Sequence, residues 1–266
     1  MIRNTPTDDR DRPRDRDGDD RAVSDLVGFI GTFAIIITAV AIITTVGIGS
    51  LGEFQLHEQH NNAVRNMEAV GNDLDRLQQQ RAKRHSTRID LSVGRLRWID
   101  DTAIEVETDT NVEHSFRPGS LRLELADTDV AFENGAVFRS DGSAGGVMKQ
   151  RPELVCRDGE RAIVSIVELD GPDQRQVGSG VVHVVGVRER TDLLFPLNRT
   201  GANSSTAPTE VDVSVRNSPR ESLWVDYFER PESGWTMVDS DTARCTVGDD
   251  GGVYVRRTVV NVSFRR

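Results

Sequence analysis

Two cysteines, Cys156 and Cys245, are the residues of this sequence best suited to form a covalent bond with each other. Two thiols allow one intrachain pairing, and they are too few and too far apart for a zinc knuckle. A disulfide is expected if this part of the chain lies outside the cell, where conditions are oxidising. The alternative is two unpaired, partly buried thiols, because sequence positions do not give a separation in space.

Three sequons for N-linked glycosylation mark a second kind of chemistry, at Asn198, Asn203 and Asn261. Such sites are modified only on the outer side of a membrane. The first two lie in a Ser/Thr-rich stretch near residue 200 that is typical of a flexible loop or linker. We therefore expect these two to be better acceptors than Asn261.

Histidines offer little sign of catalysis or metal binding. His57 and His60 are three residues apart on a predicted helix, but no HExxH motif or carboxylate cluster accompanies them. We expect both to lie on a solvated helix surface. The sequence also lacks a GxSxG elbow and a P-loop. It therefore predicts no catalytic, metal or cofactor site and no enzyme, with a hydrolase of unrecognised type as a minor alternative.

The charge of the chain excludes one class of partner. The net charge is −10, and only Lys83 and Lys149 among the 33 basic residues are lysines. An acidic chain without a basic patch is unsuited to nucleic acid. Acidic, lysine-poor composition favours hydration in concentrated salt and is typical of a halophile, although a GC-rich genome also enriches arginine.

A long apolar run near the N-terminus predicts where the rest of the chain lies relative to a membrane. No charged residue occurs between Leu26 and Gly52, whereas a membrane-spanning helix needs about 20 apolar residues. We predict a transmembrane helix over 23–52. A buried core helix is rarely apolar on every face for so long. A cleaved secretory signal has a shorter apolar region, but the small residues of "GIGSLG" keep it as an alternative.

The arginines that flank the apolar run predict its orientation. Residues 1–22 contain six arginines, but residues 53–70 contain only Arg65. Positive residues stay on the cytoplasmic side of a membrane. We therefore expect a cytoplasmic N-terminus and an extracellular C-terminal domain, in a single-pass protein of the cell membrane.

The stretch "DDRAVSDLVGFIGTFAIIITAV" resembles the N-terminus of archaeal, especially haloarchaeal, type IV pilins and pilin-like proteins. The resemblance covers about residues 19–50 and implies that a prepilin peptidase cuts between Ala22 and Val23. Asp25 stands where the commonest family pattern has proline. The stretch "HNNAVRNMEAVGNDLDRL" is more loosely similar to uncharacterised haloarchaeal pilin-like proteins.

The family resemblance implies a role for Asp25 in assembly. Cleavage would leave a cationic amine on Val23 at a helix N-terminus, and a carboxylate two residues later offsets that charge. The alternatives are that Asp25 merely lies at the level of the lipid headgroups, or that Ser24 caps the helix.

The predicted helix continues beyond the membrane over 53–84 as an amphipathic extension. One apolar stripe recurs there at spacings of three and four, formed by Val64, Met67, Val70, Leu74 and Leu77. This stripe needs an apolar partner, either the chain's own head or a neighbouring subunit's helix. The basic cluster Arg81, Lys83, Arg84 and Arg88 is expected to pair with acidic neighbours or complement the helix C-terminus.

The remainder, 85–266, alternates apolar and polar residues between turn signals and predicts many short strands. The exception is "SPRESLWVDYFER", where Ser218 is expected to cap one short helix. The predicted fold class is α+β: a long N-terminal transmembrane and amphipathic helix, then a β-rich, antiparallel sandwich-like extracellular domain. Residues 1–22 form a charged cytoplasmic leader, expected to be disordered and cleaved.

These expectations favour a membrane-anchored, pilin-like surface protein with a structural, assembly or adhesion role and no enzymatic activity. Its expected partners are membrane lipid, a prepilin peptidase and pilin-like subunits that contact its N-terminal helix. The alternative is a single-pass cell-envelope binding protein that forms no filament.

Overall fold

The computed structural model describes residues 17–91, 94–110, 112–142, 145–196, 208–248 and 251–266. Side chains are described for residues 26–45 and from residue 58 onward, within these ranges. The chain divides into two compact units, residues 1–57 and residues 58–266. The second unit is called the head below. The fold class is α+β, as the sequence predicted.

Helix α1, Asp17–Gln78, is 62 residues long. It begins before Val23, so residues 17–22, which the sequence predicted to be disordered, are helical. The sequence supplies aspartates in this first turn, where negative charge favours a helix N-terminus. The helix ends short of the predicted residue 84 because Gln80 has a left-handed backbone with φ of 59°.

In the described residues the strands form three sheets. The first sheet has the order β1 (Arg84–Asp90), β12 (Val181–Phe195), β16 (Gly252–Arg265), β10 (Arg161–Asp170), β9 (Leu154–Arg157). The second has the order β11 (Gln176–Gly178), β2 (Arg95–Ile99), β5 (Ser120–Glu124), β6 (Thr128–Glu133), β7 (Ala136–Asp141), β8 (Gly146–Gln150). The third has the order β14 (Thr236–Met237), β15 (Thr242–Thr246), β13 (Glu210–Arg216), β3 (Ala103–Thr108), β4 (Glu113–Phe116).

The first sheet has an apolar core on each of its faces. Its central strands β10 and β16 pair in parallel, whereas the other pairings described are antiparallel. Side chains alternate between the faces of a strand. Along β10, Val164 and Ile166 therefore enter one core, while Val167 and Leu169 enter the other.

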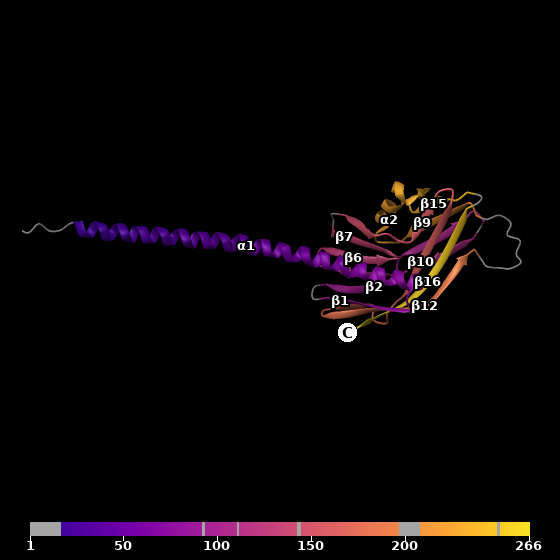
Figure 1. Ribbon diagram of the computed structural model, residues 1–266, viewed down its shortest axis with the longest axis horizontal. Coiled ribbons are helices and arrows are strands. Elements are labelled where there is room, and N and C mark those ends of the chain that lie inside the picture. The colour runs from indigo at the N-terminus through magenta and orange to yellow at the C-terminus, as the bar shows by residue number, and fades with distance from the viewer. Residues whose placement is uncertain (1–16, 92–93, 111, 143–144, 197–207, 249–250) are drawn as a thin grey trace, which may run out of the picture. The chain divides into compact units, whose positions relative to one another are not determined.

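The helix core lies between the first sheet, the second sheet and the C-terminal part of α1 (Figure 1). The predicted apolar stripe faces this core, with buried side chains at Val64, Met67, Val70, Leu74 and Leu77. On β12, glycine at position 186 permits a close approach, because an added Cβ would lie 3.0 Å from a methyl carbon of Leu77. The head itself is thus the apolar partner that the stripe requires.

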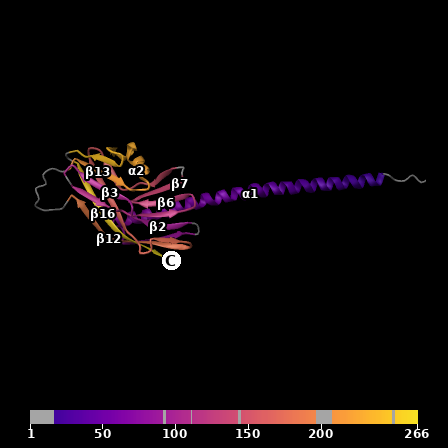
Figure 2. The same ribbon diagram turned by 180° about the vertical axis from the view of Figure 1, so that it is seen from behind.

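The second core joins helix α2, Glu221–Phe228, to the first and third sheets and to β7 and β8 of the second sheet, and β13 lies near α2 (Figure 2). The short 3₁₀ helix Pro231–Ser233 follows α2. The predicted helix exists, but the cap is different: Arg220 holds the N-cap position, and no side chain caps the helix. Ser218 lies two residues before this position, where its hydroxyl accepts from the Arg220 N–H at 3.1 Å and donates to the Glu133 carboxylate at 2.8 Å.

Candidate functional site

The apolar segment Leu26–Thr45 is a helix long and apolar enough to span a membrane. Its twenty residues have a mean hydropathy of 2.7, and all are exposed. At about 1.5 Å of rise per residue the segment is about 30 Å long, which matches the hydrocarbon thickness of a bilayer. Water is an unfavourable solvent for a surface of this composition.

Three of the four threonine hydroxyls of this segment are hydrogen-bonded within the helix itself. The hydroxyls of Thr32, Thr38 and Thr45 donate to the carbonyl oxygens of the residues four positions earlier, at 2.9, 2.8 and 2.7 Å. Lipid offers no hydrogen-bond partners, so groups within it must be paired inside the protein. The segment therefore suits an apolar solvent in its hydroxyls as well as its aliphatic side chains.

The predicted processing residues Ala22 and Val23, and Asp25 just beyond them, lie within the backbone of α1. Their side chains are outside the part of the chain that the structure describes. The peptide bond between Ala22 and Val23 thus lies inside a helix, whereas the sequence predicted it at the junction between a disordered leader and the helix.

The sequons occupy different environments. Asn198 and Asn203 lie outside the described residues. Asn261 lies on β16 between β10 and β12, opposite Asp170 and Val187, and is half-buried. A bulky glycan is suited to an exposed surface, so this central position is a poor acceptor.

Cys156 and Cys245 form a disulfide that joins β9 of the first sheet to β15 of the third. Their Cα atoms are 5.7 Å apart, and 89 residues separate them along the chain. Both residues belong to the second core. The bond therefore ties together two sheets whose described strands do not pair with one another.

The C-terminus of α1 is held by a residue that sequence analysis missed. The Arg188 guanidinium donates to the carbonyl oxygen of Leu77, at 3.1 Å. A cation near the final carbonyls of a helix complements its dipole. Three members of the predicted basic cluster, Arg81, Lys83 and Arg84, are exposed, and among the described contacts Arg188 rather than these side chains bonds to a carbonyl of the last turn.

Two aspartates on α1 fix the helix against the strands. Asp73 accepts a hydrogen bond from the Thr87 hydroxyl at 2.7 Å and lies 3.1 Å from His85. Asp75 accepts one from Gln150 at 3.0 Å. Burial, with Glu153 adding a like charge, raises the pKa of Asp75 to about 6.

His60 is not on a solvated helix surface, contrary to the prediction. Its side chain is 12% exposed, and Nε2 lies 3.3 Å from Asp127, on the turn between β5 and β6. The turn covers this part of α1, which the spacing of histidines along one helix cannot show. The side chain of His57 is outside the described part of the chain.

A buried acidic group links α2 to the second sheet. Glu133 is fully buried and accepts hydrogen bonds from Ser218 at 2.8 Å and from the Trp224 indole at 2.7 Å. The guanidinium of Arg220 lies 3.9 Å from Glu133 and donates to Asp129 at 2.6 Å. Because buried charges need such partners, this cluster is a structural connection.

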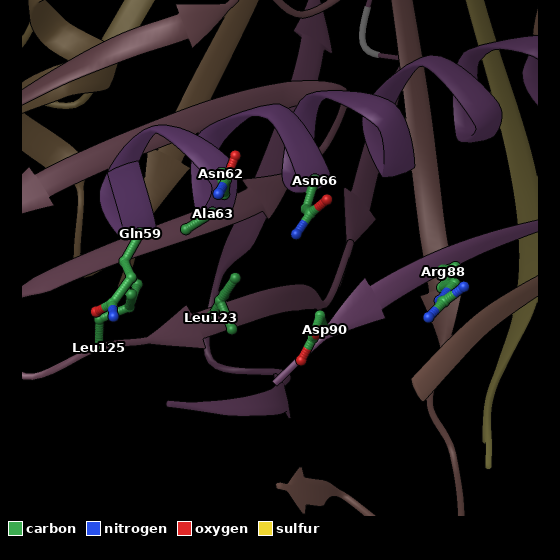
Figure 3. A pocket seen from close by; sticks show the side chains of 8 residues that line it. All are labelled: Gln59, Asn62, Ala63, Asn66, Arg88, Asp90, Leu123 and Leu125. Carbon is green, nitrogen blue, oxygen red and sulfur yellow. The ribbon is translucent and has the colours of Figure 1, made fainter. Parts of the chain in front are cut away.

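A surface groove of about 370 Å³ opens beside α1 within the head (Figure 3). It is lined by Gln59, Asn62, Ala63 and Asn66 of α1, by Arg88 and Asp90 of β1, and by Leu123 and Leu125 at the end of β5. The side chains come from three elements that are distant in sequence. In the sequence Gln59, Asn62 and Asn66 recur at spacings of three and four, which places the three amides on one side of a helix.

An apolar N-terminal helix followed by a β-rich head defines the general class of this protein. The chain belongs to a family described as "Family of unknown function (DUF7289)", which matches residues 21–263. The match covers both the apolar segment and the head. No curated protein and no solved structure matches the chain.

Proposed function

We propose that this protein is a membrane-anchored surface protein of the type IV pilin-like class, with a structural, assembly or adhesion role. The observation that carries the proposal is the contrast within α1. The segment Leu26–Thr45 is apolar and exposed throughout, while the stripe that ends at Leu77 belongs to the core of the head. One helix thus supplies both a candidate anchor and a structural element of the exported domain.

Two observations support a head on the outer side of the membrane. Six arginines precede the apolar segment, and positive charge favours the cytoplasmic side. The Cys156–Cys245 disulfide is suited to an oxidising compartment. In this proposal the head is extracellular, and the anchor contacts lipid and the helices of pilin-like subunits.

Processing by a prepilin peptidase is part of the proposal. Cleavage after Ala22 would leave Val23 as the first residue, with its amine close to the Asp25 carboxylate in sequence. Because the two residues are only two positions apart, their opposite charges would attract each other. Asp25 would then offset the new charge as the helix leaves lipid to pack against other subunits.

Mass spectrometry of the native N-terminus, in membrane and sheared-surface fractions, tests this function. A chain that begins at Val23 in both fractions is the expected result. The Asp25→Asn variant should begin at the same residue but be depleted from the sheared fraction. An intact leader would contradict the pilin-like route and favour a single-pass anchored binding protein that forms no filament.

A further inference from the structure

We propose that the groove beside α1 binds a neutral saccharide, with the amides of Asn62 and Asn66 as its main hydrogen-bonding groups. Each amide carries two donors and an acceptor on one planar group. Such a group can bond to neighbouring hydroxyls of a sugar ring at the same time. Gln59 adds a third amide on the same side of the helix (Figure 3).

The three amides and the Arg88 guanidinium of the groove are available to a ligand. Among the described residues, no hydrogen bond engages the side-chain amides of Gln59, Asn62 or Asn66. The Arg88 guanidinium likewise has no hydrogen bond or ion pair with another described residue. These groups differ in this respect from Asp73 and Asp75 on the same helix, which are engaged by the strands.

The spacing of the amides suits a ligand of several units. Asn62 is three residues from Gln59 and four from Asn66, which gives axial separations of about 4.5 and 6 Å along a helix. The three amides therefore form a row about 10 Å long. A row of this length, in a groove of about 370 Å³, has room for a short oligosaccharide rather than a single small ion.

The charge of the groove favours an uncharged ligand. Arg88 and Asp90 contribute opposite charges, and the remaining polar groups are neutral amides. A phosphate or polyanion would meet the Asp90 carboxylate beside the only cation among the described lining residues. A cationic ligand would be repelled by the Arg88 guanidinium.

The apolar part of the lining completes the match. Leu123 is buried and Leu125 is half-buried at the end of β5, and Ala63 is buried on α1 between the amides. Sugar rings have C–H faces that pack on aliphatic side chains, while their hydroxyls need donors and acceptors. The groove offers both kinds of surface.

Saccharide binding goes beyond the proposed anchoring and does not depend on it, since all these lining residues belong to the head. Isothermal titration of the full-length chain tests the inference, in a zwitterionic detergent that carries no sugar. The probes are maltotriose, cellotriose and mannotriose as neutral ligands, trigalacturonate as an acidic ligand, and a Gly-Ser hexapeptide.

At least one neutral trisaccharide should bind, and the double variant Asn62→Ala/Asn66→Ala should weaken it about tenfold through two lost hydrogen bonds. The matched control Asn61→Ala removes an exposed amide that does not line the groove, and should leave the affinity unchanged. Asn66→Asp keeps the size of the side chain and should also weaken binding. This variant replaces the double variant in the experiment if the double variant unfolds.

Three results would overturn the inference. The first is the absence of binding by all three neutral trisaccharides. The second is equal affinity in the groove variants and the wild-type chain, with matching thermal unfolding midpoints. The third is preferential binding of trigalacturonate or the hexapeptide.

Discussion

The two halves of α1 differ in the surroundings of their apolar side chains. In the segment Leu26–Thr45 every side chain is exposed, and three of its four hydroxyls bond to the helix's own carbonyls. In the half that belongs to the head, one stripe is buried and the polar side chains reach neighbouring strands, as Asp73 does to Thr87. The same helix is thus built for two surroundings.

This difference teaches which substitutions should affect folding of the head. The stability of a soluble unit depends on contacts within it. Substitutions in the stripe, the disulfide and the polar anchors should change the free energy of unfolding of the head. Substitutions in the exposed apolar segment should leave it unchanged, and each prediction below tests one side of this division.

Loss of the disulfide should have the largest effect. For a loop of 89 residues, Cys156→Ser with Cys245→Ser should lower the free energy of unfolding by about 4 kcal/mol, because the unfolded chain gains freedom. Urea denaturation of the purified full-length chain measures this change. Retention of the protein in the membrane fraction should be unaffected. Unchanged denaturation of the head would contradict a structural role for the bond.

Leu77→Ala should lower the free energy of unfolding by about 3 kcal/mol, because it leaves a cavity in the helix core. Leu77 is fully buried and lies against the position of Gly186. The same denaturation experiment measures the loss. A change below about 0.5 kcal/mol would show that the end of α1 is not part of the core.

Asp75→Asn should stabilise the head at alkaline pH. The pKa of Asp75 is raised from 3.8 to about 6 in the folded state, so folding favours its neutral form. The contribution of Asp75 to the free energy of unfolding is therefore fully present below pH 3.8 and is lost as the pH rises through 6. The amide removes this dependence and can still accept the hydrogen bond from Gln150.

For Asp75→Asn we expect the free energy of unfolding to rise by about 1–2 kcal/mol at pH 8, after allowance for the partial exposure of this residue. Little change is expected at pH 4. Thermal unfolding at both values measures it. Asp73→Asn is the matched control and should destabilise, since it weakens the contacts with Thr87 and His85. A gain that is equal at both pH values would contradict the proposed cause.

Ile36→Ala should have the smallest effect on the head. Ile36 is 54% exposed in the apolar segment and does not belong to either core. Its change in the free energy of unfolding should lie within about 0.5 kcal/mol of zero in urea denaturation. A loss similar to that of Leu77→Ala would erase the distinction between the two halves of α1.

Much of the fold followed from periodicity in the sequence. A stripe at spacings of three and four predicts one buried helix face, and Met67 and Leu77 lie in that face. Alternation predicted strands that include Ile89 and Trp98, because the strand period is two. The apolar segment was evident because its composition alone distinguishes it.

Long-range pairing could not be predicted in the same way. The parallel alignment of β10 with β16 joins strands about ninety residues apart, and alternation is the same in either direction. Arg188 at the end of α1 and Asp127 beside His60 are also contacts between distant segments. The groove depends on the same pairings, so the amide row was visible in the sequence but its opposite wall was not.

The surroundings of the segment Leu26–Thr45 are tested most directly by fractionation of cells that express the full-length chain. Membranes washed with alkaline carbonate are analysed beside intact cells treated with protease. The account predicts that the chain stays with the washed membranes and that protease removes its C-terminal head. Release into the carbonate wash, or a head protected from protease in intact cells, would contradict it.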